Sequence, residues 1–166
     1  MQQFWQALFA RPEPELLQQA RHLLSPELFE LFCTMPYPEQ AHALDVFQRL
    51  QSNGHVDQNL LTAALLHDVG KTRCPPDIWE RVLVVLVQHF TPKLAERWGS
   101  GEPRGLKRSL VAAKRHPEWG AEMVDQSGAS PQVVELIRRH HDGTPYKTKN
   151  EVAQFLAALQ AADDHN

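Results

Sequence analysis

The decisive stretch of this sequence runs from Leu65 to Lys71 and reads Leu-Leu-His-Asp-Val-Gly-Lys. It closes an apolar run at helical spacing, and Gly70 then marks the end of that helix. The adjacent His67 and Asp68 are therefore expected at a helix end, followed closely by the ammonium group of Lys71. Imidazole and carboxylate together are a ligand set for divalent transition metals. The stretch predicts a metal site with a phosphate-binding cation beside it.

Around this stretch, apolar residues recur at helical spacing almost everywhere, and alternating runs typical of strands are absent. Serine or threonine before proline marks several helix starts, and glycine follows several periodic stretches. We therefore predict an all-α fold. The expected helices span roughly residues 2–9, 13–34 with a break near Ser25, 38–52, 57–68, 78–98 with a break near Thr91, 104–115, 117–127, 131–141 and 150–164.

Length and composition are those of one ordinary globular domain of 166 residues. The net charge of −3 gives no global electrostatic footprint for nucleic acid or an anionic membrane. Cys33 and Cys74 are interpreted as reduced thiols of a cytoplasmic protein, because no signal peptide precedes them. The longest apolar run, Val82 to Val87, is too short to span a bilayer. We expect a cytoplasmic protein without a membrane or nucleic-acid partner.

Further histidines and aspartates occupy helix faces and helix ends elsewhere in the chain. His42 borders the apolar stripe of its helix, and His116 precedes Pro117, which we interpret as the start of a new helix. Side chains from several helices can converge on one interior point, which is how helical bundles build metal sites. The candidate metal ligands are His42, His67, Asp68, His116, His140, His141 and either Asp163 or Asp164. The other histidines are interpreted as ordinary core or surface residues: His22, His55, His89 and His165.

The order of these residues resembles the HD-domain superfamily of metal-dependent phosphohydrolases, which is named for its adjacent His-Asp pair. Leu65 to Lys71 is similar to the central motif of that family almost letter for letter. Four further segments resemble its other motifs in the same order, around His42, His116, His140 and Asp163. The resemblance implies an HD-type helical bundle over residues 35–166, with residues 1–34 as a helical extension packed on it.

By this resemblance, the chain would bind a divalent metal ion, which could be Fe, Mn, Zn, Co, Ni or Mg. Because the motifs are those of the two-metal branch of the family, a pair of ions is expected. The first would be held by His42, His67, Asp68 and Asp163. Asp68 would bridge to a second, held by His116 and His140, with His141 as a further candidate. Asp163 is preferred to Asp164 because it follows the pair of small residues Ala161-Ala162, as the aspartate of the family does.

The implied activity is hydrolysis of a phosphoester by metal-activated water. Asp68 and Lys71 are the expected catalytic residues, Asp68 as the metal bridge and Lys71 as a contact to the phosphate. The expected partner is a small phosphorylated molecule: a nucleotide, a dinucleotide or a small phosphoester. The branch of the family that opens cyclic dinucleotides carries a longer motif, with Gly-Tyr-Pro after its paired histidines. Here the residues from Asp142 to Tyr146 form a shorter segment in a different order, which argues against hydrolysis of cyclic di-GMP.

Two alternatives share this ligand set. Some proteins of the HD fold use a di-iron pair and oxygen to cleave C–C or C–P bonds. Activity with Mn or Co in the absence of oxygen would favour hydrolysis over that chemistry. The second alternative is a non-catalytic regulatory or ligand-sensing domain. The intact ligand set argues against it, because degenerate versions typically lose ligands.

Overall fold

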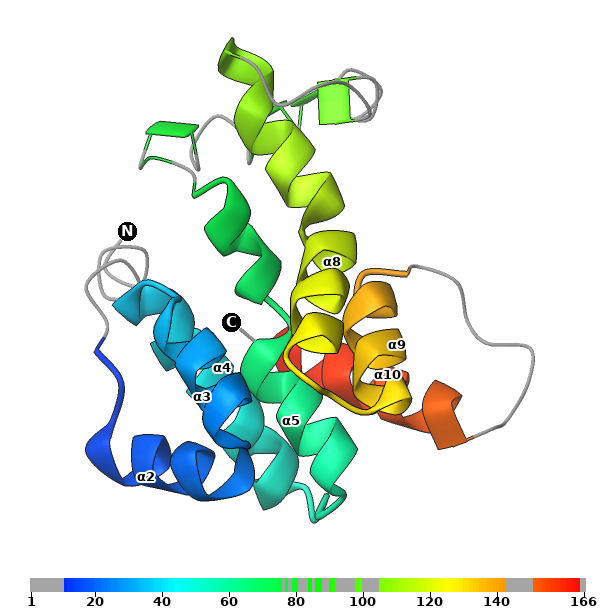
Figure 1. Ribbon diagram of the computed structural model, residues 1–166. Helices are drawn as coiled ribbons and strands as arrows, with labels where there is room; N and C mark the ends of the chain where they lie inside the picture. The colour runs from blue at the N-terminus through cyan, green and yellow to red at the C-terminus, as the bar shows by residue number, and fades with distance from the viewer. Residues whose placement is uncertain are drawn as a thin grey trace.

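The computed structural model describes residues 11–75, 105–142 and 151–164, together with isolated positions between residues 77 and 99. Every regular element among the described residues is a helix, and none of these residues lies in a β-strand (Figure 1). The prediction of an all-α helical bundle is confirmed. The helix expected over residues 2–9 lies outside the described residues, and most of the one expected over residues 78–98 does as well.

The α-helices of the described part are α2 (Pro14–Leu23), α3 (Pro26–Cys33), α4 (Tyr37–Ser52), α5 (Gln58–Leu66), α8 (Arg108–Gln126), α9 (Pro131–Arg139) and α10 (Glu151–Asp163). Two short 3₁₀ helices accompany them, η1 (Val69–Arg73) and η2 (Gly105–Lys107). Across the residues that the structure describes, none of these helices has the length and apolar character needed to cross a membrane.

The N-terminal pair α2 and α3 shows the predicted break near Ser25. The hydroxyl of Ser25 accepts a hydrogen bond from the amide of Leu28 at 3.3 Å, and Pro26 opens α3. Apolar side chains of both helices, among them Ala20 and Phe32, belong to the same core as α4 and α5. Helices α2 and α3 therefore pack on the bundle through a shared core, while the division of the chain into an extension over residues 1–34 and a domain over residues 35–166 stays a prediction.

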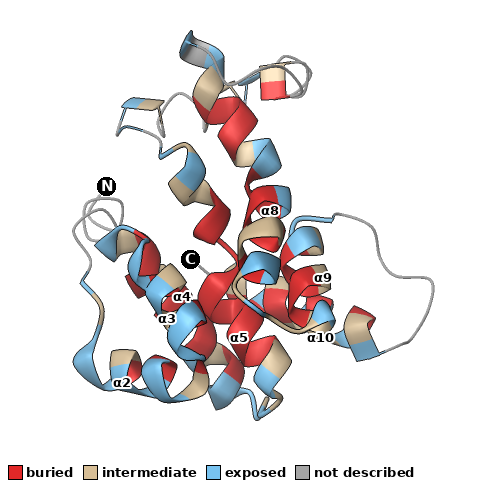
Figure 2. Cartoon of the chain, in the orientation of Figure 1, coloured by how far each residue is buried: buried red, intermediate tan, exposed pale blue. Residues whose placement is uncertain are grey.

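Helix α5 forms the centre of the bundle. Every residue from Leu60 to Leu66 is buried, so α5 has no solvent face from Leu60 to its end (Figure 2). Asp57 caps its start, with Oδ1 accepting hydrogen bonds from the amides of Asn59 and Leu60. Helices α4, α9 and α10 all pack against α5. Burying each leucine contributes about 2 kcal/mol, and the end of α5 consequently lies deep inside the protein.

Helix α8 corrects one expectation from the sequence. Pro117 was predicted to start a new helix, but α8 runs without interruption from Arg108 to Gln126 and contains Pro117. Proline has no amide hydrogen to donate to the carbonyl four residues earlier, which here is Ala113. The ring of His116 replaces the missing donor, because its Nδ1 lies 3.0 Å from that carbonyl oxygen. A side chain therefore satisfies the carbonyl that proline leaves open.

Gly70 allows α8 to approach η1 at backbone distance. A Cβ atom on Gly70 would lie 2.0 Å from the carbonyl oxygen of His116 and 2.6 Å from the amide nitrogen of Gly120. Real Cβ atoms essentially never approach other atoms within 3.0 Å. Gly70 was expected to end the helix of His67, but α5 already ends at Leu66 and Gly70 lies within η1. Its role is to set the separation between Asp68 and the helix that carries His116.

Candidate metal centre

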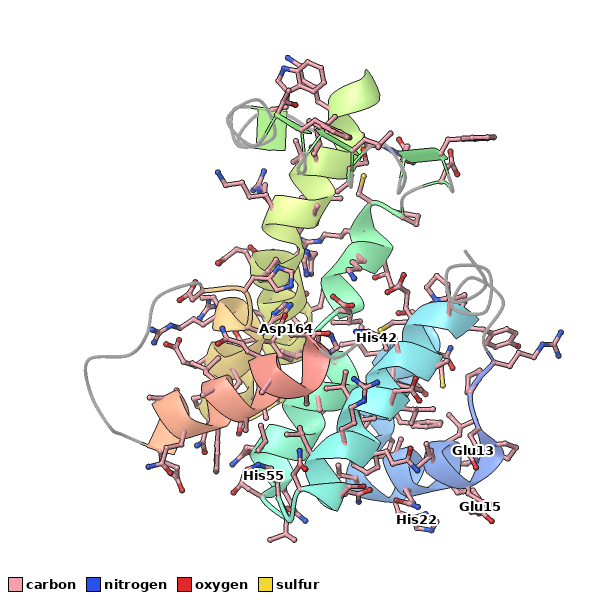
Figure 3. All side chains as sticks on the ribbon, turned by 180° about the vertical axis from the view of Figure 1, so that it is seen from behind. Glu13, Glu15, His22, His42, His55 and Asp164 are labelled. Carbon is pink, nitrogen blue, oxygen red and sulfur yellow. The ribbon has the colours of Figure 1, made fainter. Side chains whose placement is uncertain are left out.

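The structure brings all the side chains predicted as ligands to one place, where the ends of α5, α9 and α10 meet α4 and α8: His42, His67, Asp68, His116, His140, His141 and Asp163. Of the two candidate aspartates, Asp163 faces this cluster, whereas Asp164 is exposed. Figure 3 shows the end of α10, labelled at Asp164, beside His42 on α4. The geometry prefers Asp163, as the sequence did.

The first group of potential ligands consists of His42, His67 and Asp163, which come from α4, the end of α5 and the end of α10. Nε2 of His42 lies 2.9 Å from Oδ1 of Asp163, and Nε2 of His67 lies 3.6 Å from the same oxygen. Ligand atoms bound at about 2.0–2.3 Å to one metal ion lie roughly 3–4 Å from one another. The spacing of the first group therefore fits a metal ion.

The second group contains only imidazoles, those of His116, His140 and His141. Nε2 of His116 lies 3.3 Å from Nε2 of His140, and both rings are buried. The ring centroid of His141 lies 4.2 Å from that of His140 and 4.8 Å from that of His116. Two helices, α8 and α9, thus bring three nitrogen ligands around a second point.

Asp68 lies between the two groups and presents one carboxylate oxygen to each. Its Oδ2 is 3.7 Å from Nε2 of His42 and 3.4 Å from Nε2 of His67. Its Oδ1 is 3.3 Å from Nε2 of His116. The residue is only 3% exposed. A single buried carboxylate that faces two sets of nitrogen ligands has the arrangement of a bridging ligand.

The three buried histidines are fixed in one tautomer by their own helices. Nδ1 of each ring pairs with a carbonyl oxygen three residues earlier: Ala64 for His67 at 2.9 Å, Ala113 for His116 at 3.0 Å and Ile137 for His140 at 2.7 Å. Because a carbonyl only accepts, Nδ1 must be the donor, and a neutral ring then carries its lone pair on Nε2. These Nε2 atoms point into the cluster as metal ligands do.

When the rings are neutral, these three Nε2 lone pairs face one another or carboxylate oxygens, none of which is a donor. Nε2 of His67 is buried and has no hydrogen-bond partner among the described residues, although carboxylate oxygens lie 3.4 and 3.6 Å away. The Nε2 atoms of His116 and His140 face each other as two acceptors. Buried polar atoms without partners are costly, and a cation at each position would satisfy them. The donor set therefore fits metal ions.

The pKa values separate the two groups. Burial alone would lower the pKa of His67, but the carboxylates of Asp68 and Asp163 outweigh burial and raise it to about 10. Burial, reinforced by the charge on His67, holds the pKa of His140 well below its usual value. Burial also lowers the pKa of His141 to about 4. In the absence of metal, the first group consequently retains a proton, whereas these members of the second group are neutral.

Lys71 contacts the cluster through Asp68. Its Nζ lies 2.6 Å from Oδ2 of Asp68 and 3.5 Å from Oε2 of Glu39, a buried residue on α4. Burial alone would raise the pKa of Asp68, but Lys71 and His67 outweigh it and hold this pKa well below its usual range. The sequence predicted Lys71 but missed Glu39, because an acidic residue in the first turn of a helix is ordinarily a solvated one.

The cluster opens to solvent on one side. Asp68, His67, His116 and His140 are buried, whereas the side chains of Lys71, His42 and Asp163 are 33%, 23% and 20% exposed. His141 is exposed, and it lines a cleft of about 330 Å³ between α8 and α9. Lys114 and Arg138 also line this cleft. Solvent therefore reaches the cluster at the exposed parts of Lys71, His42, Asp163 and His141.

The histidines interpreted as ordinary residues stand apart where they are described. His22 and His55 lie away from His42, at the far end of the bundle (Figure 3). Nδ1 of the exposed His22 also pairs with a carbonyl of its own helix, that of Gln18, so this bond alone does not identify a ligand. Burial and convergence distinguish the cluster. His89 and His165 lie outside the described residues.

Comparison with protein families matches the chain to the HD domain over residues 41–165. Because this match covers most of the chain, the protein belongs to the HD-domain family, and the predicted resemblance is confirmed. Neither curated proteins nor solved structures gave a match to this chain. Members of the family are commonly metal-dependent phosphohydrolases, and the buried histidine and aspartate groups of this chain could hold divalent metal.

Proposed function

We propose that this protein is a metal-dependent phosphohydrolase in which Asp68 bridges two divalent metal ions. The observation that carries the proposal is the placement of the Asp68 carboxylate, with Oδ2 toward His42 and His67 and Oδ1 toward His116. A carboxylate shared by two metal ions about 3.5–4 Å apart is typical of enzymes that hydrolyse phosphoesters. Membership of the HD-domain family supports the same chemistry.

In this proposal, the first metal ion would be held by His42, His67, Asp163 and Asp68. The second would be held by His116, His140, His141 and Asp68. Mixed imidazole and carboxylate ligands suit Mn, Fe, Co, Ni and Zn, whereas Mg prefers sites built almost entirely from oxygen. We therefore expect transition metals to support activity better than Mg.

When bound, the metal ions supply a water nucleophile near neutral pH and neutralise charge on the phosphate oxygens. The chain itself supplies rigidity. The Nδ1 bonds of His67, His116 and His140 keep each Nε2 aimed into the cluster, so little reorganisation accompanies the reaction. The buried position of Asp68 excludes bulk water from behind the centre. The exposed side, near Lys71 and His141, is where we expect the phosphoester to enter.

We propose that Lys71 contacts the phosphate of the substrate. Its ammonium group is held between Asp68 and Glu39 and is partly exposed on the open side. Lys71→Met should therefore keep its metal ions but lose about a hundredfold in kcat/KM, because a lost transition-state contact costs about 2–4 kcal/mol. Arg73→Met is the matched control, since Arg73 pairs with Glu122 at the surface. Full activity in Lys71→Met would remove the role of this lysine.

The substrate is proposed to be a small phosphorylated molecule, with nucleotides as the first class to test. The experiment strips the protein of metal and reloads it with Mn, Fe, Co, Ni or Mg. Each form is assayed against nucleotides, dinucleotides and generic phosphoesters, with and without oxygen. The proposal expects hydrolysis with Mn or Co in the absence of oxygen. Turnover only with Fe and oxygen would indicate an oxygenase, and a metal-replete but inert protein would indicate a regulatory domain.

A further inference from the structure

Gln160 on α10 reaches across to the end of α9. Its side-chain Nε2 donates hydrogen bonds to the carbonyl oxygen of His140 at 3.0 Å and to that of Asp142 at 3.0 Å. A primary amide has two hydrogens to donate, and here both are used on one turn of backbone. That turn carries His140 and His141, which are two of the three imidazoles of the second ligand group.

The end of α9 needs such a partner. The last carbonyls of an α-helix have no donor within their own helix, and His140 is the C-cap residue directly after α9. The turn makes two bonds of its own, from the amide of Asp142 to the carbonyl of Arg139 and from the guanidinium of Arg139 to the Asp142 carboxylate. Gln160 adds bonds that come from a different helix.

Helix α10 is itself fixed against the helix of the first group. Asp163, three residues after Gln160, lies 2.9 Å from His42 on α4. Nη1 of Arg49, also on α4, donates to the carbonyl oxygen of Ala162 at 3.2 Å. One helix therefore contributes a potential ligand to the first group and fastens the backbone that carries two potential ligands of the second.

We propose that Gln160 is a positioning residue for the second metal site, which holds the His140–His141 turn in the geometry that binds metal. The proposal rests on the metal centre proposed above and is independent of whether the protein hydrolyses a phosphoester. Gln160 touches neither ligand nitrogen, so it acts only through the backbone. Residues that orient metal ligands typically change metal affinity by about 10–100-fold when replaced, and we expect an effect of that size at the second site alone.

The test is a calorimetric titration of the metal-stripped, full-length protein with Mn²⁺. Gln160→Met keeps the length of the side chain and removes both donors without adding charge. Gln154→Met makes the same change on the exposed face of α10 and is the matched control. His116→Ala identifies the binding step of the second site. The melting temperature without metal shows whether Gln160→Met folds normally. If it does not, Gln160→Asn replaces it, because its amide is one methylene shorter and is withdrawn from the two carbonyl oxygens.

We expect wild type and Gln154→Met to bind two equivalents of Mn²⁺, and the Gln160 variants to bind the second about 10–100-fold more weakly with the first unchanged. Equal binding by Gln160→Met and Gln154→Met would overturn the proposal. So would a parallel weakening of both sites, which would indicate a general packing role, or a wild type with a single site. A wild type that binds two metal ions but cleaves no phosphoester would remove the proposed function and leave this inference in place.

Discussion

The two ligand groups that meet at Asp68 are built in different ways. The first draws His42, His67 and Asp163 from three helices and includes a carboxylate. The second has only imidazoles, from α8 and from the adjacent residues at the end of α9. The first holds a proton in the absence of metal, because two carboxylates raise the pKa of His67 to about 10. Burial, by contrast, keeps the second neutral at His140 and His141.

Because of this difference, the two proposed metal ions would be bound by different combinations of charged and neutral ligands. The first group attracts a cation by the charge of Asp163 as well as that of Asp68, which acts strongly in a buried site. The second group depends on neutral nitrogen ligands and on Asp68 for its only negative charge. We therefore expect the first site to fill before the second. Because three of its four proposed ligands are nitrogen atoms, the second site should favour Zn, Co and Ni over Mg.

The largest effect is expected from Asp68→Ala, because this variant lacks the carboxylate that both ligand groups share. Both metal ions should be lost, and hydrolysis should fall by about a thousandfold or more, since the bridge and its charge disappear together. Elemental analysis and a phosphoester assay measure the two losses. Asp45→Ala removes an exposed carboxylate from α4 and should change neither. Retention of both metal ions by Asp68→Ala would show that this residue does not join the groups.

The next effect separates the groups. His116→Ala should lose the second metal ion and keep the first, whereas Asp163→Ala should lose the first and weaken the second only modestly. Elemental analysis after dialysis would then give about one metal ion per chain for either variant, against about two for wild type. If each substitution instead removes both metal ions, the two groups form one cooperative site and do not bind metal independently.

Gly70→Ala should disturb the second group without touching a ligand. The new Cβ would lie 2.0 Å from the carbonyl oxygen of His116, so α8 must move away from Asp68. Overpacking of this kind costs about 1–3 kcal/mol, which corresponds to a drop of roughly 2–12 °C in melting temperature for a protein of this size. Metal binding at the second site should weaken as well.

Gly54→Ala is the control for that substitution. It meets no atom within 4 Å, but its φ of 85° disfavours a side chain, so it should cost about 1–2 kcal/mol with normal metal binding. Normal binding of both metal ions by Gly70→Ala would show that α8 tolerates the displacement.

The two sites should also differ in how their metal affinity depends on pH, by less than the effects above. A metal ion at the first group must displace the proton of His67, so its apparent affinity should fall about tenfold for each unit that the pH drops below 10. His140 and His141 are neutral between pH 6 and 8, so the second site should change much less. Titrations of the metal-stripped protein at pH 6 and pH 8 measure both. Parallel pH dependence at the two sites would contradict the assignment.

The raised pKa of His67 makes the stability of the metal-free protein decrease with rising pH, whereas it makes metal affinity increase. Because the pKa of His67 is raised on folding, its contribution to stability is complete below the unfolded value near 6.5. That contribution disappears as the pH rises through about 10. Melting temperatures of the stripped protein should therefore fall over this range if other groups are unchanged.

Several features of the fold and site could be predicted because their signals are local. Helical periodicity and capping residues define α4 and α10 to within about two residues. The adjacent His67 and Asp68 at the end of an apolar helix predict a buried site, and the order of the other histidines identifies the family. Each of these signals lies within a short segment of sequence.

The features that could not be predicted from the sequence depend on contacts between segments that are far apart in the chain. Pro117 was misread because proline usually breaks a helix, and only the ring of His116 shows how α8 continues. Glu39 and Gln160 have no motif. Glu39 matters through an ammonium group 32 positions later, and Gln160 through a carbonyl 20 positions earlier. Such roles arise from the packing of helices, which periodicity does not encode.

The proposed role of Asp68 is to join two metal ions. A crystal structure of the Mn-loaded protein, with anomalous scattering to locate the metal, would show whether it does. We predict two anomalous peaks about 3.5–4 Å apart, one among His42, His67 and Asp163 and the other beside His116 and His140, with one oxygen of Asp68 bound to each. A single peak, or two peaks of which Asp68 binds only one, would contradict it.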